Sequence, residues 1–311
     1  MALAGAPSTR AHIPDSLTRH LRKAFVEEYD IISKNLLYPR LYNVVNSDIE
    51  TEKDTVNAGL GLFGAKAEGA DPDYDSPQQA YTKEYTHSSY ALGVQVTLEA
   101  MQDDLHGIFR GLTKAGGGLA QVADYTKERS SMDLFNSTLT SGTVYTAGGT
   151  NYSLLSTSHF RADGSTWSNR PTNDLDLSIE ALEFAIGHWM VNMVNQRGQI
   201  LRMPPVLLMV GAADWALAKR LVNSLQRPQG ADNDKNVIRD LDLEVLVHPL
   251  LTNDGRWLLF GPKRSLGLTY FERYKPNVIQ LPVGDNGNYR AMGFYRESHG
   301  ASTVSGVWGS P

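Results

Sequence analysis

The sequence has no cysteine, no long apolar run and no excess of positive charge. Without cysteine it has no disulfide framework, thiolate metal site or cysteine nucleophile, and this composition fits a chain made in a reducing cytoplasm. Its longest apolar stretch, Val206–Val210, is far shorter than the ~20 residues of a membrane span, and Met1–Pro7 lacks the features of a secretory signal. A net charge of −5 argues against a dedicated nucleic-acid binder.

What is present is the composition of a folded protein. Hydrophobic residues make up 41% and charged residues 20% of the 311 residues, which excludes wholesale disorder. This length allows one large domain or two ordinary ones.

Near the N-terminus, apolar residues recur every fourth position at Leu17, Leu21, Phe25 and Tyr29. This spacing predicts a short amphipathic helix within residues 17–36. Two interpretations stay open from the residues alone. The helix is either the first helix of its own domain or part of an arm that reaches a neighbouring subunit.

The next region predicts a long β-hairpin. Residues 59–77 are rich in Gly, Ala, Asp and Pro, which favour turns. Residues 81–87 and 92–96 then alternate apolar and polar side chains with a period of two, which is typical of strands. The tip has too few apolar residues to fold back onto a core.

Helices are predicted for residues 98–114 and 119–138, with a break at Gly116–Gly118, because three glycines in a helix interior cost on the order of 1 kcal/mol each. Another helix begins at Ile179, after an N-cap at Asp176 or Ser178, and is predicted to end at Asn195–Gly198. The remaining elements are a helix over 213–223 and strands over 206–210, 243–247, 257–260, 289–295 and 301–308.

Several patterns resemble chemical sites without their context. Gly59–Gly64 matches G-x-G-x-x-G, which binds a dinucleotide when a buried strand precedes it and a helix follows it. Here a charged segment precedes the motif, and the segment that follows contains Gly69, Pro72 and Pro77, so we expect no dinucleotide site. The histidines never occur in pairs at helix spacing, so no metal site is indicated. The residues Ser156, Ser158, His159 and Asp163 are those of a catalytic triad but lack a nucleophile elbow, so hydroxyl-rich turns are expected.

From about residue 153 to 274 the chain resembles the major capsid proteins of tailed bacteriophages, in the branch that includes Mu-like prophage head subunits. The segments that carry the resemblance are Leu154–Phe160, Asp163–Asn169, Arg197–Val210, Ala218–Ser224, Asp232–Asn236 and Val247–Thr252.

The resemblance implies an α+β fold of the Hong Kong 97 type and no catalytic residue, cofactor or metal. It implies an N-terminal arm over 1–50, an E-loop hairpin with its flanking strands over 51–97, P-domain helices with the spine helix over 98–145, an A-domain over 146–285, and C-terminal strands returning to the P-domain over 286–311.

The implied function is self-assembly as pentamers and hexamers into an icosahedral shell that encloses double-stranded DNA without sequence-specific binding. The expected location is the virion capsid, after assembly in the host bacterial cytoplasm. The expected partners are other copies of the chain, a portal protein and, as an option, a decoration protein. A separate scaffolding protein is also expected, since only residues 1–50 precede the hairpin.

Two sets of residues are predicted to lie at contacts between subunits. The E-loop set is Phe63, Lys66, Asp71, Tyr74 and Tyr81, and the axial-loop set of the A-domain is Arg227, Asp232, Asn233 and Lys235. Two alternatives remain: an encapsulin-like shell around cargo enzymes, which shares the fold, and a nicotinamide-dependent oxidoreductase built on Gly59–Gly64.

Overall fold

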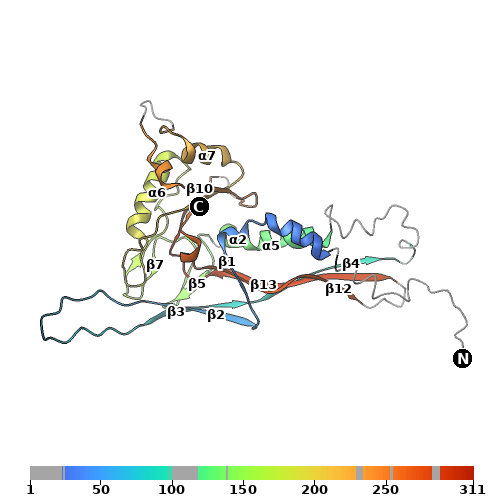
Figure 1. The fold of residues 1–311 in the computed structure, drawn as a ribbon, viewed down its shortest axis with the longest axis horizontal. Coiled ribbons are helices and arrows are strands. Elements are labelled where there is room, and N and C mark those ends of the chain that lie inside the picture. The colour runs from blue at the N-terminus through green and yellow to red at the C-terminus, as the bar shows by residue number, and fades with distance from the viewer. Residues whose placement is uncertain are drawn as a thin grey trace, which may run out of the picture. The chain divides into compact units, whose positions relative to one another are not determined.

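The computed structural model describes residues 23, 25–97, 99, 118–137, 139–228, 234–252, 255–281 and 288–311. The chain forms two compact units. Figure 1 labels the helices and strands of both. Unit 1 comprises Met1–Leu36, His87–Glu128 and Glu272–Glu297, and unit 2 comprises Leu37–Thr86, Arg129–Phe271 and Ser298–Pro311. Helix α5 (Leu119–Asn136) and strands β12 (Leu268–Leu281) and β13 (Tyr289–Ala301) contribute residues to both units.

Unit 1 contains a small apolar core to which the N-terminal helix belongs. Residues 25–32 are helical and lead into a 3-10 turn at Ser33–Asn35. Phe25 is 1% exposed and clusters with side chains of α5, β12 and β13. This part of the predicted helix therefore packs in its own subunit, whereas Leu17 and Leu21 lie outside the described residues.

Residues 92–96 lie in strand β4 (Ser88–Val96), which confirms the predicted strand, and β4 pairs antiparallel with β13. The four-stranded sheet to which they belong has the order β1-β12-β13-β4, with β1 at Asn43–Asn46. Strand β12 was not predicted. Its sequence carries Glu272, Arg273, Lys275 and Pro276, which obscure the period of two.

Unit 2 is built on a sheet of order β10-β9-β11-β14. Strand β9 (Leu207–Val210) pairs in parallel with β10 (Glu244–Val247), while β11 (Trp257–Phe260) is antiparallel to both β9 and β14 (Val307–Ser310). Every residue of β9, β11 and β14 is buried, which explains why β9 and β11 are continuous apolar runs.

Two helices pack on this sheet: α6 (Ile179–Asn192) on β14, and α7 (Trp215–Asn223) on β9 and β10 (Figure 1). The Ser178 hydroxyl accepts a hydrogen bond of 3.1 Å from the Ala181 amide, so the predicted N-cap is confirmed. The smaller elements of unit 2 are α2 (Tyr38–Leu41), β2 (Thr51–Asn57), β3 (Gln79–Thr86), β5 (Tyr145–Ala147), β6 (Thr150–Tyr152), β7 (His159–Phe160), β8 (Thr166–Trp167) and 3-10 turns at Val237–Leu241 and Lys263–Ser265.

Two predicted boundaries are wrong. Helix α6 ends at Asn192 rather than at Asn195–Gly198, because Val194 already forms a β-bridge with Ile200. Gly198 does adopt a positive φ of 77°, but in the turn that closes this bridge. The predicted strand over 301–308 is interrupted by a turn in which Gly306 has a φ of 94°, and β14 begins only at Val307.

Helix α5 confirms the prediction over 119–138 to within two residues. The helix predicted over 98–114 lies outside the described residues, apart from Glu99, as do Gly116 and Gly117. In the part of the chain that is described, no helix has both the length and the apolar character needed to cross a bilayer.

Candidate assembly surfaces

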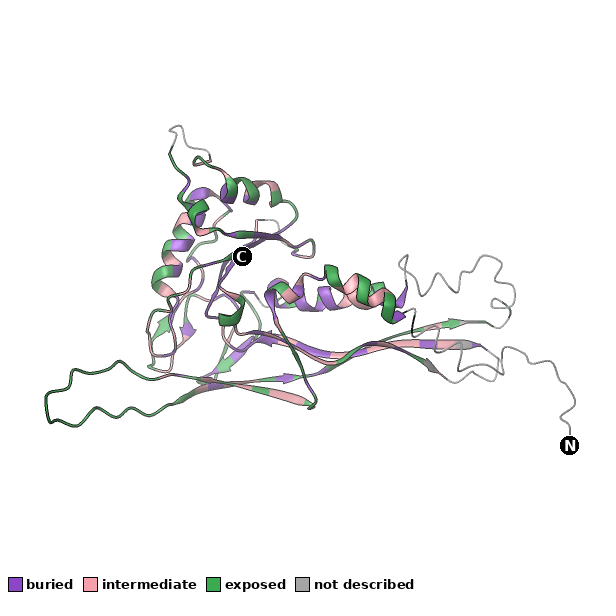
Figure 2. Ribbon diagram, in the orientation of Figure 1, coloured by how far each residue is buried: buried purple, intermediate pink, exposed green. Residues whose placement is uncertain are grey.

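The most exposed part of unit 2 is the hairpin loop, residues 58–78, which connects β2 to β3. The two strands pair antiparallel from Thr51 opposite Thr86 to Asn57 opposite Gln79, which confirms the predicted hairpin. Between them the chain forms neither helix nor strand, and every residue from 60 to 78 is exposed. Figure 2 shows the loop in the colour of exposed residues along its length.

The hairpin loop exposes large apolar side chains. Leu62 is 86%, Phe63 105% and Tyr74 88% exposed. Complete burial of one such side chain is worth roughly 1.5–3 kcal/mol. Exposed apolar side chains gathered on one segment are typical of a surface that binds another molecule. Four of the five residues predicted for E-loop contacts, Phe63, Lys66, Asp71 and Tyr74, are on this loop and exposed.

Tyr81, the fifth predicted contact, is a correction. Its ring is 7% exposed and stacks on Tyr145 with ring centroids 4.6 Å apart. Its hydroxyl donates to the carbonyl oxygen of Ser302 at 2.9 Å, and burial raises the pKa of the Tyr81 hydroxyl. Tyr81 therefore stabilises the base of the hairpin in its own subunit.

The neck of the hairpin loop is held by Asp75. One carboxylate oxygen accepts the Gly61 amide at 2.7 Å, and the other accepts the Ser76 amide at 2.9 Å and lies 3.3 Å from the Arg197 guanidinium. The Gly61 hydrogen bond, followed by Arg197, lowers the pKa of the Asp75 carboxyl. Gln199 adds a hydrogen bond of 3.1 Å to the Leu60 carbonyl, so the neck is tied to the turn after α6.

The G-x-G-x-x-G residues Gly59–Gly64 fall inside this loop. A strand, β2, precedes them, but it is only partly buried, and no helix occurs within residues 58–78. A dinucleotide site needs a helix N-terminus at this point to hold the pyrophosphate. Among the described residues there is also no group of three His, Asp or Glu side chains that could hold a metal ion.

Of the residues with triad chemistry, His159 is buried in a hydrogen-bond network that includes the half-buried Ser156, whereas Ser158 and Asp163 are exposed. Asn169 donates to the carbonyls of Leu154 at 2.9 Å and Val307 at 3.1 Å, so its Oδ1 must be the atom that accepts from Ser156 N and His159 Nε2. The Nε2 of His159 therefore carries the proton, and Nδ1 accepts from the Tyr145 hydroxyl at 3.0 Å.

Burial lowers the pKa of His159 to about 4, which keeps the ring neutral. Asp163 instead pairs with Arg161 at 2.6 Å and accepts from Ser165. The predicted hydroxyl-rich turns are confirmed. Both ring nitrogens of His159 form hydrogen bonds inside unit 2.

The axial-loop residues are described only in part, because Asp232 and Asn233 lie outside the described residues. The stem of this loop is closed by a β-bridge between Gln226 and Lys235. Arg227 forms ion pairs with Glu183 at 3.0 Å and Glu180 at 3.5 Å, and Lys235 pairs with Asp240 at 2.7 Å.

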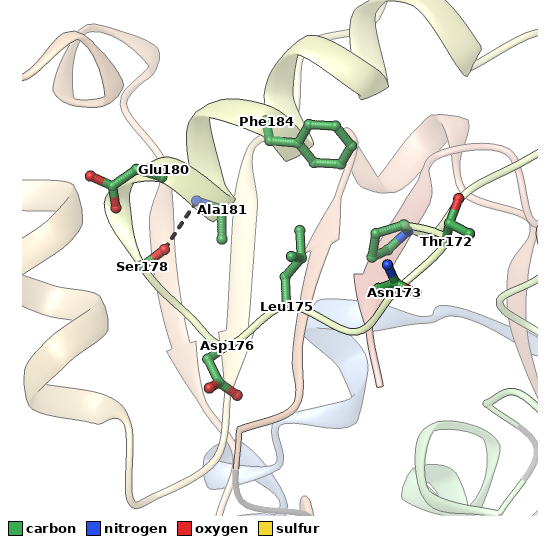
Figure 3. Close-up of a pocket in the computed structure, with 9 residues that line it drawn as sticks. Thr172, Asn173, Leu175, Asp176, Ser178, Glu180, Ala181 and Phe184 are labelled. Atoms are coloured by element: carbon green, nitrogen blue, oxygen red, sulfur yellow. Dashed lines mark hydrogen bonds between the residues drawn. The ribbon is translucent and has the colours of Figure 1, made fainter.

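A second exposed surface lies at the N-terminal end of α6 and was not predicted. Residues 171–184 border an open groove of about 550 Å³ (Figure 3). Figure 3 shows Leu175 pointing toward the helix, with Phe184 above it and Glu180 and Asp176 to one side. Phe184 is 50% and Val191 63% exposed, on the face opposite to the buried stripe of α6. Apolar residues outside the predicted stripe were the signal that could have revealed it.

Comparison with known proteins agrees with this architecture. A family model described as "Phage capsid protein" matches residues 80–302, well over half of the chain. No curated protein matches the sequence.

Many solved structures resemble the chain at low sequence identity, and three of them are capsids or particles of different origin. The capsid of a native GTA particle has a TM-score of 0.57 at 13% identity, and the match covers 87% of this chain and 88% of that one. The capsid of cyanophage P-SCSP1u has a TM-score of 0.55 at 8% identity, covering 88% and 87%. A virus-like particle from Pyrococcus furiosus has a TM-score of 0.52 at 9% identity, covering 95% and 99%.

At these identities the structural matches establish the fold, which is the mixed helix-and-sheet fold of Hong Kong 97-type capsids. The family match favours a phage capsid over an encapsulin-like compartment, and it indicates a structural protein in place of an oxidoreductase. The chain belongs to the phage capsid protein family.

Proposed function

We propose that this capsid protein assembles first as pentamers and hexamers and then as an icosahedral shell around double-stranded DNA. Assembly takes place in the host bacterial cytoplasm, directed by a separate scaffolding protein and completed by a portal protein and, optionally, a decoration protein. The net charge of −5 fits a shell that encloses DNA without a dedicated phosphate-binding face.

Within this proposal the predicted domains acquire roles. The A-domain, residues 146–285, lies around the axes of pentamers and hexamers, with Arg227, Asp232, Asn233 and Lys235 at its axial loop. The hairpin loop is the E-loop, and its tip lies on a neighbouring copy. The C-terminal residues 286–311 join the P-domain through β13, although β14 pairs with β11 in the sheet of unit 2.

The observation that supports the proposal most strongly is the hairpin loop itself. Its residues 60–78 are all exposed, its base is fixed by Asp75 and Tyr81, and it presents Leu62, Phe63 and Tyr74 to solvent. A segment that is held at its base and exposes its apolar side chains suits a contact with another subunit. Contacts of this heterologous kind close into rings and then shells.

The test is to express the chain alone and together with the scaffolding gene of its phage. Light scattering after size-exclusion chromatography and negative-stain microscopy should reveal rings or closed shells. A species that stays at the monomer mass of 34.3 kDa at every salt and protein concentration, with scaffold present, would contradict the proposal.

A further inference from the structure

The groove at the N-terminal end of α6 has an apolar floor, and none of the residues that the structure describes fills it. Pro171, Leu175, Ala181 and Phe184 supply apolar lining. Phe184 and Val191 are seven residues apart and therefore share one helix face, which extends the apolar surface along α6. Met190 is also 54% exposed but points from a different face of the helix.

The surroundings of the groove carry an excess of negative charge. Four carboxylates stand there: Asp174, Asp176, Glu180 and Glu183. Among the described residues two cations pair with them: Arg170 with Asp174 at 2.8 Å, and Arg227 with Glu183 at 3.0 Å and Glu180 at 3.5 Å. A ligand that fits this surface must combine a large apolar side chain with positive charge.

The hairpin loop does not meet this requirement. It carries apolar side chains, but its sequence contains four acidic residues and one basic residue: Glu68, Asp71, Asp73 and Asp75 against Lys66. Placing it in the groove would bring carboxylates against carboxylates, which disfavours the pairing.

The outer face of α7 does meet the requirement. Trp215 is 57% exposed, and Lys219 follows one turn later on the same face. Arg220 is exposed beside it. The residues that α7 buries against the sheet are Ala218, Leu221 and Val222, whereas more than half of the Trp215 surface stays exposed beside them.

The α6 groove and the exposed side chains of α7 lie apart from each other within unit 2. α7 packs on β9 and β10 and α6 on β14, at opposite edges of the sheet. Arg227, which contacts α6, follows the C-terminal end of α7, whereas Trp215 is at the other end of this nine-residue helix. Two complementary surfaces at separate places on one subunit are what a ring of identical copies requires.

We propose that the α6 groove of one copy binds Trp215 and Lys219 from α7 of the next copy in the ring. This inference rests on the proposed shell function and specifies one of its contacts. Tryptophan in a pocket with a charged neighbour is typical of residues that dominate interface energy. Trp215→Ala should therefore raise the critical concentration for assembly roughly 30-fold or more.

The absence of cysteine in the chain allows a direct test. A Phe184→Cys, Trp215→Cys double variant, assembled with scaffold under reducing conditions and then oxidised, should give a ladder of disulfide-linked species up to whole rings. A mixture of the two single variants should stop at linked dimers. The matched control, Met190→Cys with Trp215→Cys, should give no ladder, because Met190 is equally exposed on another face of α6.

A second measurement covers the case in which the cysteines themselves weaken assembly. Asp176→Lys and Lys219→Glu should each reduce assembly, and the variant carrying both changes should recover it. Circular dichroism melting should show all of these variants folded like the parent.

The outcomes separate the contact from the function. Shells that form normally but give no 184–215 disulfide, together with a combined charge variant that is no better than either single variant, would overturn the proposed contact and leave the shell function standing. An unmodified chain that never assembles would overturn both.

Discussion

The sheet of unit 2 and the hairpin loop belong to the same compact unit but place their apolar side chains in opposite environments. In β9, β11 and β14 every residue is buried, whereas every residue from 60 to 78 is exposed. Burial of apolar area stabilises the fold by ~25 cal/mol per Å². The buried sheet therefore stabilises the subunit, whereas the exposed loop contributes little to its stability. The loop's apolar side chains gain their free energy only when another copy covers them.

The largest expected effect comes from removing the loop. Replacement of Phe63–Ser76 by a Gly-Ser linker should abolish closed shells, because the lost contact is repeated at every copy. The thermal transition of the unassembled protein should remain nearly unchanged. Circular dichroism melting and electron microscopy of the same preparation measure both. A large fall in melting temperature would mean that the segment belongs to the subunit core, and normal shells would mean that it is no E-loop.

The opposite result is expected in the lobe. Asn169→Ala removes four hydrogen bonds at once and leaves His159 Nε2, the Ser156 amide and two carbonyls buried without this partner. We expect the free energy of unfolding to fall by about 3–5 kcal/mol. Urea titration measures this, and Asn173→Ala, at an exposed position of the following loop, is the matched control. A loss no larger than that of the control would show that the network does not stabilise the lobe.

Much of this contrast was predictable from the sequence, because burial leaves a periodic pattern. The stripe of α6 and the apolar runs of β9 and β11 gave the right elements, and the Gly- and Pro-rich segment after β2 gave the loop. Two features were lost for physical reasons. β12 carries charges and Pro276 where a strand usually alternates, and the apolar residues on the outer face of α6 do not belong to its core stripe.

Tyr81 shows a further limit of the sequence. The alternation of β3 predicts that one of its faces is buried but not by which subunit. The Tyr81 ring stacks on Tyr145 of the same subunit, and no pattern within residues 79–86 distinguishes this contact from one with a neighbouring subunit. The partner comes from β5, more than sixty residues away in the chain, so only the fold brings them together.

A smaller effect is expected from acid, through the buried His159. His159 has a pKa of about 4 when folded against 6.5 as its ordinary value, so below pH 6.5 the unfolded chain binds a proton that the folded chain does not. The contribution of neutral His159 to the free energy of unfolding is therefore fully present above pH 6.5. It falls by about 1.4 kcal/mol per pH unit between pH 6.5 and 4.

His159→Gln should remove this part of the slope while lowering stability at neutral pH. Urea unfolding at several pH values between 7 and 4 measures both. Equal slopes for the two proteins would mean that His159 is not the group that titrates.

The smallest effect is expected at the neck, where loop and lobe meet. Asp75→Asn keeps an oxygen for the Gly61 amide but loses the acceptor of the Ser76 amide and the ion pair with Arg197. The Asp75 and Arg197 side chains are 42% and 25% exposed. Because ion pairs this exposed contribute ~0–1 kcal/mol, the melting temperature should hardly change. The loop, however, would hold its direction less well, so the rate of assembly should fall a few-fold at constant subunit concentration. Time-resolved light scattering measures the rate, with Glu68→Gln, at an exposed position of the same loop outside the predicted contact set, as control. If the two variants assemble equally fast, Asp75 does not orient the loop, and the contrast between a fixed base and a free tip fails at this residue.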